Sequence, residues 1–334
     1  MIAVFALSLL FFVGVSHAAH TGNFVPLMEH LEEYEARHNA LLHPNTNNTT
    51  TTTTSLLWLT NLFGDITALL PPNRLTTARC MIYIIGMLAI LYQVAPGFLF
   101  RMIHGGTHSP LNHRLVQTYS SGIASAIILM YCHVSCSNMT LVDAYPFSLL
   151  PWMLECIRNL LVLGGGQRTN KTAVRYHKSP QVLGLVLSAL FLYAMTAHDG
   201  HPTAALQTMT TAWLVLGVAV IYNPRGAAKM LVSHHDMTAA WDATSQLMVR
   251  MIGFNMLAHG GVAAALLFGT ATIADPLTAF GIGYSAWLWK IVFLQFVTGD
   301  LVKAGVDRRT VYALLALHGG VVATILFLPN NVGA

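Results

Sequence analysis

Charged residues are scarce in this sequence. Aspartate, glutamate, lysine and arginine together make up 9% of the 334 residues, whereas 54% of the residues are hydrophobic. A typical soluble domain carries about 25% charged residues. A chain with so few charges cannot cover a water-facing surface, so its apolar segments must face lipid or one another. The composition therefore predicts an all-α integral membrane protein.

The few basic residues form no continuous patch. The formal net charge is +4 at pH 7, but lysine and arginine lie in short clusters between apolar runs. Such clusters are typical of the signals that set membrane topology. We therefore predict membrane lipid as the partner of this chain and no nucleic-acid partner.

Cysteine and catalytic motifs are also scarce. The four cysteines, at positions 80, 132, 136 and 156, match neither a disulfide framework nor a zinc pattern. The chain has no Walker loop, nucleophile elbow, dinucleotide fingerprint or HExxH motif. The loop histidines match no zinc spacing either; they are His104, His108, His113, His234 and His235. These absences predict no metal site and no cofactor, and they favour a non-enzymatic protein.

Residues 1–18 are predicted to form a signal peptide. Their apolar core, from Ile2 to Val15, is too short to span a membrane comfortably, and Ser16 and Ala18 occupy the small-residue positions of a cleavage site. The sequence lacks the basic segment that usually precedes such a core. An uncleaved anchor therefore stays open as the alternative.

Residues 19–75 differ in composition and are predicted to form a short luminal segment. The stretch "PLMEHLEEYEARH" predicts a short amphipathic helix, and "NTNNTTTTTT" is a threonine-rich linker with N-glycosylation acceptors at Asn47 and Asn48. The apolar run "SLLWLTNLFGDITALLPP" is short for a span, so we expect a helix lying on the membrane interface.

The rest of the chain contains eight apolar segments, most of them near the ~20 residues that cross a bilayer core. The expected spans cover residues 79–100, 115–133, 146–163, 180–198, 204–222, 247–269, 276–297 and 310–328.

The loops between these segments alternate in charge. The connections after the second, fourth and sixth spans contain no lysine or arginine, whereas the other connections do. Because basic residues of short loops stay in the cytosol, both termini are expected to be luminal or extracellular, in a membrane of the secretory pathway or the plasma membrane. Asn138 is then a luminal glycosylation acceptor, and Asn170 is cytosolic. Arg74 and Arg79, at the luminal start of the first span, disagree with this pattern.

Two apolar segments end in the same way, which suggests an internal repeat. In "YQVAPGFLFRM" and "IYNPRGAAKM", Pro96 corresponds to Pro224 and Arg101 to Lys229. A proline stops the helix, and the basic residue holds its cytosolic end at the headgroups. Similar correspondences, about 130 residues apart, continue through the other spans. We therefore predict two tandem four-helix repeats, residues 76–198 and 199–334, related by an axis along the membrane normal.

The motif "NPRGAAKM", followed by "LMVRMIGFNMLAHGG" with Arg250 and Gly253, resembles the small four-helix membrane proteins of the DoxX-like family. The resemblance covers mainly the second repeat. The first repeat has Tyr119 and Gly122 nearby and no matching arginine. The resemblance implies a four-helix membrane fold for each repeat.

Few ionisable residues lie within the expected spans, and four of them share a depth. Glu155, His259, Lys290 and His318 lie at similar distances from the cytosolic ends of their helices, ~11–12 Å beneath the boundary. Because such residues are costly in lipid, they usually face the bundle interior and pair. We expect Glu155 to pair with Lys290, with Arg158, one turn away, as the competing partner.

This polar layer has three interpretations that the sequence leaves open. The ion pair fixes which helices meet, or the layer relays protons or ions, or the long basic side chains extend to the headgroups. His259 and His318, each followed by two glycines, also suggest an alternative in which both histidines ligate a haem in a membrane oxidoreductase. The competing interpretation is that the paired glycines allow close packing between helices and that no haem is bound. The leading hypothesis is a non-enzymatic membrane protein that is structural or handles a small solute, proton or lipid between its repeats.

The expected topology predicts which acceptors carry glycan. Treatment with a glycosidase should increase the protein's electrophoretic mobility through Asn47, Asn48 or Asn138, and Asn170→Gln should change nothing, because Asn170 faces the cytosol. Glycan on Asn170 would require the opposite orientation.

Overall fold

The computed structural model describes residues 73–96, 109–136, 139–164, 177–196, 201–232, 241–306 and 308–328. The expected signal peptide, nearly all of the luminal segment and the acceptors Asn47, Asn48 and Asn138 lie outside these residues. They stay predictions.

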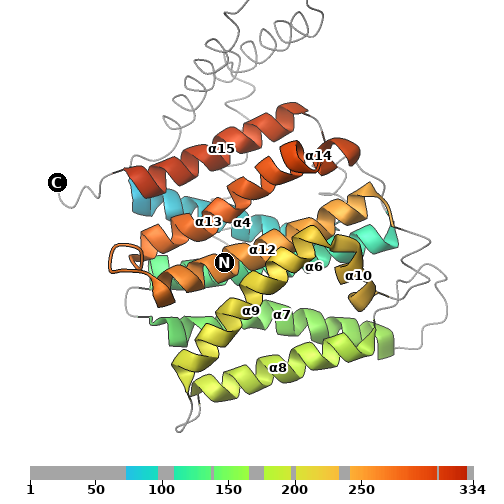
Figure 1. Ribbon diagram of the computed structural model, residues 1–334, viewed down its shortest axis with the longest axis horizontal. Helices are drawn as coiled ribbons and strands as arrows, with labels where there is room; N and C mark the ends of the chain where they lie inside the picture. The colour runs from blue at the N-terminus through green and yellow to red at the C-terminus, as the bar shows by residue number, and fades with distance from the viewer. Residues whose placement is uncertain are drawn as a thin grey trace, which may run out of the picture.

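The described chain is all-α (Figure 1). Its helices are α4 (Arg74–Val94), α6 (Pro110–Ser135), α7 (Leu141–Gly164), α8 (Lys178–Thr196), α9 (Pro202–Tyr222), α10 (Pro224–Leu231), α12 (Ala243–Phe268), α13 (Pro276–Val292), the π-helical turn Phe293–Val297, α14 (Asp300–Lys303) and α15 (Arg308–Phe327).

Seven helices among the described residues are long and apolar enough to cross a membrane: α4, α6, α8, α9, α12, α13 with its π-helical turn, and α15. This finding indicates a polytopic membrane protein. The third expected span, residues 146–163, lies within α7, which has 24 residues but is not one of the seven. Within its sequence α7 carries Asp143, Glu155, Arg158 and Asn159.

The first helix is displaced from its expected position. The expected span covers residues 79–100, whereas α4 begins at Arg74 and has its C-cap at Ala95. The start is fixed by Asn73, whose side chain accepts hydrogen bonds from the backbone N–H groups of Leu75 and Thr76. The end comes directly before Pro96, because a proline disfavours the helical conformation of the residue before it.

Other helix starts also carry a polar cap, which satisfies backbone N–H groups that have no partner within the helix. Ser109 caps α6, and Asp242 and Ser245 form a reciprocal capping box at α12. Asp275 caps α13 through the backbone N–H of Thr278, at 3.0 Å. These caps place short polar turns between long apolar helices.

The sequence "NPRG" turns the chain from α9 into α10. Asn223 is the C-cap of α9 and the N-cap of α10, and its Oδ1 accepts a hydrogen bond from the Gly226 backbone N–H at 3.0 Å. A Cβ atom at Gly226 would lie 2.3 Å from the Asn223 side chain, so a larger residue here would displace the asparagine that caps α10. Pro224 stands at the first position of α10, where a helix tolerates proline.

The helices α6 and α12 form the centre of the bundle (Figure 1). They pack against each other, and 78% of the most apolar part of α6 and 61% of that of α12 are buried, against 11% for α8. The helix α8 instead presents large apolar side chains outward; these include Val182, Leu183, Val186, Leu187, Leu190 and Tyr193. An outer helix that is apolar on its exposed face fits a lipid surrounding.

All four cysteines are free thiols.

Packing between α9 and α12 depends on two glycines. A Cβ atom at Gly217 would lie 2.9 Å from the Gly253 carbonyl oxygen, and one at Gly253 would lie 2.8 Å from that of Gly217. Small residues let membrane helices approach this closely.

We therefore predict that Gly253→Ala lowers the free energy of unfolding by about 1–3 kcal/mol, since the added methyl group would lie 2.8 Å from the Gly217 carbonyl oxygen, which belongs to the backbone, and 2.8 Å from the Ile221 side chain. Thermal unfolding of the detergent-solubilised protein measures the change. Gly86→Ala is the matched control, because its Cβ would lie 3.6 Å from Ile127, an ordinary contact. Equal stability of both variants would contradict the close approach.

Candidate functional site

A cavity of about 150 Å³ lies among α4, α6, α12, α13, α14 and α15. Its wall is mostly aliphatic, with five residues that carry polar or ionisable groups: Tyr92, Tyr119, Trp287, Lys290 and His318. Two of its helices, α4 and α6, belong to the first half of the chain (α4 to α8), and the others belong to the second half (α9 to α15). The cavity therefore lies between the two halves.

Lys290 supplies the positive charge of this cavity. Its Nζ donates a hydrogen bond to the Tyr119 hydroxyl at 3.1 Å and lies 5.4 Å from the centre of the Tyr119 ring, within the range of a cation–π contact. Lys290 takes part in none of the ion pairs among the described residues. The described lining residues include no aspartate or glutamate. The amine thus faces an apolar space with a phenol as its polar contact.

Tyr119 is held in place by Asn255, which connects three helices. The Asn255 amide donates to the Tyr119 carbonyl at 2.9 Å, and Trp287 Nε1 donates to Asn255 Oδ1 at 2.9 Å. Gly122 leaves room for this side chain, because a Cβ there would lie 3.1 Å from Asn255. The Tyr92 ring packs edge-to-face on Tyr119 at 5.7 Å. Asn255 therefore anchors the backbone at Tyr119, and the Tyr119 ring packs against that of Tyr92.

His318 adds a second polar group to the wall. Its ring lies 5.3 Å from that of Tyr284. Neither His318 Nδ1 nor the Tyr284 hydroxyl has a hydrogen-bond partner among the described residues. Buried polar groups usually find a partner in protein, water or ligand.

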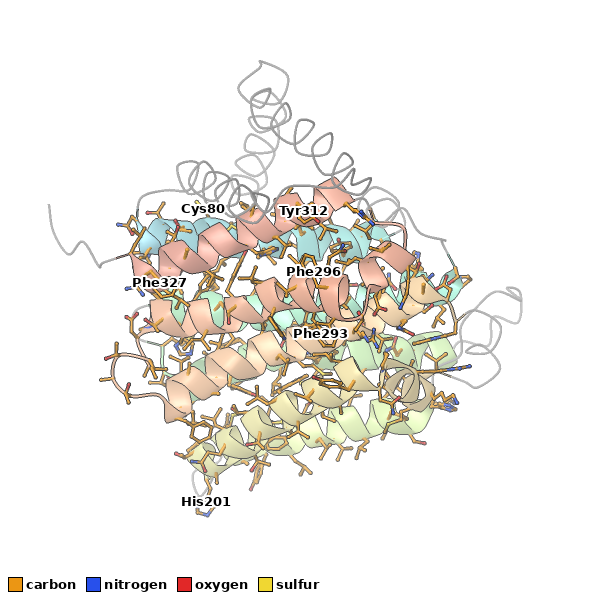
Figure 2. All side chains as sticks on the ribbon, turned by 45° about the horizontal axis from the view of Figure 1, so that its top comes forward. Cys80, His201, Phe293, Phe296, Tyr312 and Phe327 are labelled. Atoms are coloured by element: carbon orange, nitrogen blue, oxygen red, sulfur yellow. The ribbon has the colours of Figure 1, made fainter. Side chains whose placement is uncertain are left out.

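The helix α14 and the residues that follow it contribute to the cavity wall. Leu301 of α14 and Val306 line the wall. Gly299 comes directly before α14 and Gly305 directly before Val306, and their φ angles are 64° and 78°. Those backbone angles favour glycine. The π-helical turn between α13 and α14 buries Phe293 and exposes Phe296 (Figure 2). A buried ion pair to α12 then fixes α14.

That ion pair joins Arg250 to Asp300. Arg250 also donates through Nε to the Ile221 carbonyl at 3.0 Å, and Gln246 donates to Asp300 Oδ1 at 3.1 Å. Asp300 is 1% exposed. Arg250 thus connects the end of α9 to α14. Arg250 belongs to the motif seen in the sequence, whereas Asp300, which lies just beyond the expected seventh span, was not among the predicted site residues.

Glu155 lies in a separate polar network in the first half. Its carboxylate accepts hydrogen bonds from Thr118 at 2.9 Å, Ser121 at 3.2 Å and Asn159 at 3.3 Å, and it pairs with Arg158 at 2.5 Å. Glu155 is 4% exposed, and its oxygens are well supplied with donors. A buried carboxylate needs such partners.

Arg158 and Asn159 extend this network to two more helices. Arg158 donates to Gln93 of α4 at 2.8 Å, and Asn159 donates to Gln181 of α8 at 3.3 Å. The network therefore ties α4, α6, α7 and α8 together.

The expected pair of Glu155 with Lys290 is wrong, and the competing partner Arg158 is confirmed. The reason is the position of the helices. Glu155 lies on α7, which packs against α6 and α8, whereas Lys290 lies on α13, which packs against α12 and α15. Figure 1 shows α7 and α13 on opposite sides of α12. Similar depth in the membrane did not imply contact.

His259 lies apart from the cavity. Its Nε2 is 2.9 Å from the Ser148 hydroxyl, and its ring packs edge-to-face between Tyr145 at 5.1 Å and Trp213 at 5.3 Å. The structure therefore places His259 and His318 in different aromatic clusters and does not bring the two imidazoles to one site. The haem alternative gains no support from this arrangement.

The histidines that were considered as metal ligands can be placed only in part. Among the described residues, no group of three histidine, cysteine, aspartate or glutamate side chains is close enough to hold a metal. His113 lies in α6, and the loop histidines His104, His108, His234 and His235 lie outside the described residues.

Comparison with protein families, curated proteins and solved structures finds no match to the chain.

The geometry predicts which charges are coupled. Arg158→Met should lower the free energy of unfolding by about 2–3 kcal/mol, because it leaves Glu155 charged and buried; the loss is moderated because Arg158 is 28% exposed. The Glu155→Gln/Arg158→Met double variant should recover much of this loss. A thermal-unfolding cycle in detergent measures the coupling.

The pair Glu155→Gln and Lys290→Met is the control cycle, and its effects should add. Additive effects for Glu155 and Arg158, together with coupling of Glu155 to Lys290, would contradict the described geometry.

Proposed function

We propose that this chain is a polytopic membrane protein of eight spans, built from two tandem four-helix repeats, that handles a small solute in the cavity between them. The observation that carries the proposal is the position of Lys290, whose amine faces an apolar cavity bounded by helices of both halves. The proposal assigns no covalent chemistry to the site.

The helix α7 is the proposed eighth span. Its length of 24 residues is ample for a bilayer core. Its polar residues Glu155 and Asn159 are buried and make hydrogen bonds inside the bundle. A polar helix is compatible with lipid when its polar groups face inward and pair.

Helix neighbours support the duplication. The contacts of α4 with α6, α6 with α7 and α7 with α8 correspond to those of α9 with α12, α12 with α13 and α13 with α15. The contacts that join the halves correspond as well: α8 packs on α9, and α15 packs on α4. Exchanging the two halves leaves this pattern of neighbours unchanged.

The crossing points also correspond, residue by residue. In the first half, Ser120 Oγ donates to the Ala89 carbonyl at 2.6 Å. In the second half, Gly253 and Gly217 stand at the same positions along their helices and make the close backbone approach. Equivalent residues thus mark the same crossing in each half.

The contact of α6 with α12 fits an axis between the halves. Asn112 and Ser245 are each the third residue of a 26-residue helix, and the Ser245 hydroxyl donates to Asn112 Oδ1 at 2.7 Å. Gly122 and Asn255 also share a position along these helices and face each other. Residues meet their own equivalents only next to a twofold axis. The proposed DoxX-like resemblance concerns this four-helix unit.

The proposed topology also accommodates Arg74, one of the two basic residues that disagree with the loop charges. Arg74 donates to the Ile325 carbonyl at 2.6 Å and lies 3.7 Å from Asp275. The Arg74 guanidinium therefore binds a carbonyl near the end of α15 and pairs with the Asp275 carboxylate. A paired arginine at the luminal end does not weigh against a cytosolic side set by the other loops.

Solute binding predicts a local response at Met251. This residue lines the cavity, so its methyl NMR signal should shift when toluene or benzyl alcohol is added to the protein in lipid nanodiscs. Met195, which is buried but does not line the cavity, is the internal control for nonspecific partitioning. Leu314→Trp should abolish the Met251 response, because the larger side chain fills the space. Equal shifts at both methionines, or no shift at Met251, would contradict a solute site.

A further inference from the structure

We propose that the ligand of this cavity is a small organic monocarboxylate with an apolar body of about benzene size, and that Lys290 and Tyr119 bind its carboxylate. This inference rests on the proposed function and names the class of solute. It is argued from the charge, the hydrogen-bond donors and the volume of the cavity.

The charge of the cavity favours an anion. Lys290 faces a wall whose described residues carry no carboxylate, and the buried acids Glu155 and Asp300 are already paired with Arg158 and Arg250. An uncompensated charge is costly in a membrane interior. A ligand with one negative charge offsets this cost, whereas a cation adds to it.

The free donors favour a carboxylate. An ammonium group has three donors, and Lys290 uses one of them on the Tyr119 hydroxyl. Because that hydroxyl oxygen accepts from Lys290, its own proton is available to a ligand. His318 Nδ1 is a further group without a described partner. Two oxygens of one carboxylate can accept from the ammonium and the phenol together, and charge-assisted hydrogen bonds of this kind are strong.

The volume limits the rest of the ligand. A cavity of about 150 Å³ matches a benzene-sized guest. Apart from Lys290, Tyr119 and His318, the wall consists of aliphatic side chains, Met251, Tyr92 and Trp287, which gain most from an apolar body. A short acid of the size of benzoate or hexanoate fits this space. A long-chain fatty acid from the surrounding lipid has the same headgroup but exceeds it.

The test uses the full-length protein in nanodiscs and the Met251 methyl signal. Benzoate and hexanoate should bind, and palmitate should neither shift the signal nor displace benzoate. Lys290→Met should weaken benzoate by about tenfold or more while toluene still binds. Tyr119→Phe should weaken benzoate less, because the ammonium stays. The control is Lys303→Met, whose exposed amine contacts the Thr298 carbonyl outside the cavity, and it should change nothing.

The possible results distinguish a failure of the carboxylate assignment from a failure of the proposed solute-binding function. If toluene binds but benzoate binds no better in the wild type than in Lys290→Met, the cavity holds a solute and the carboxylate assignment is wrong. If palmitate competes as well as benzoate, the assigned size is wrong. If no probe shifts Met251, the proposed function itself fails. Should Lys290→Met unfold, Lys290→Gln and Tyr119→Phe give the same comparison of benzoate with toluene.

Discussion

The contact between α6 and α12 is the constraint on which the rest of this structure depends. These two helices are the most buried of the bundle, and every other long helix packs against one of them or against a helix that does. Asn255 fixes their register, because it binds the Tyr119 carbonyl of α6 and the Trp287 indole of α13. Gly122 makes this possible by leaving space for the amide. The tyrosine that contacts Lys290 is therefore positioned by the central crossing itself.

Charge is neutralised locally around that centre. The first half keeps Glu155 with Arg158, and the second half keeps Asp300 with Arg250, so each half satisfies its own buried carboxylate. Lys290 differs, since its described partner is a phenol and it lies where the two halves meet. In a chain with so little charge, a buried amine without a carboxylate partner is costly to keep. Ligand binding gives a physical reason for that cost.

The sequence predicted the helices well, because the apolar runs and the polar or proline residues at their ends act locally. Helix α9 (Pro202–Tyr222) covers the expected span 204–222, and Pro224 follows it as expected. The partners of the buried charges were harder to predict, because they depend on which helices are neighbours. Glu155 and Lys290 stand at the same position in α7 and α13, yet those helices lie on different sides of the central pair. The cavity itself had no sequence signal, since it is formed by aliphatic residues from six helices.

A density map of the protein in nanodiscs with 4-iodobenzoate tests the central claim most directly. The account predicts ligand density between the two halves, with the carboxylate next to Lys290 Nζ and the Tyr119 hydroxyl and the iodine among the aliphatic side chains. It also predicts that α4 to α8 superpose on α9 to α15 by rotation about an axis beside Asn112 and Ser245. A map in which the cavity is filled by side chains, or in which the ligand lies elsewhere, would contradict the account.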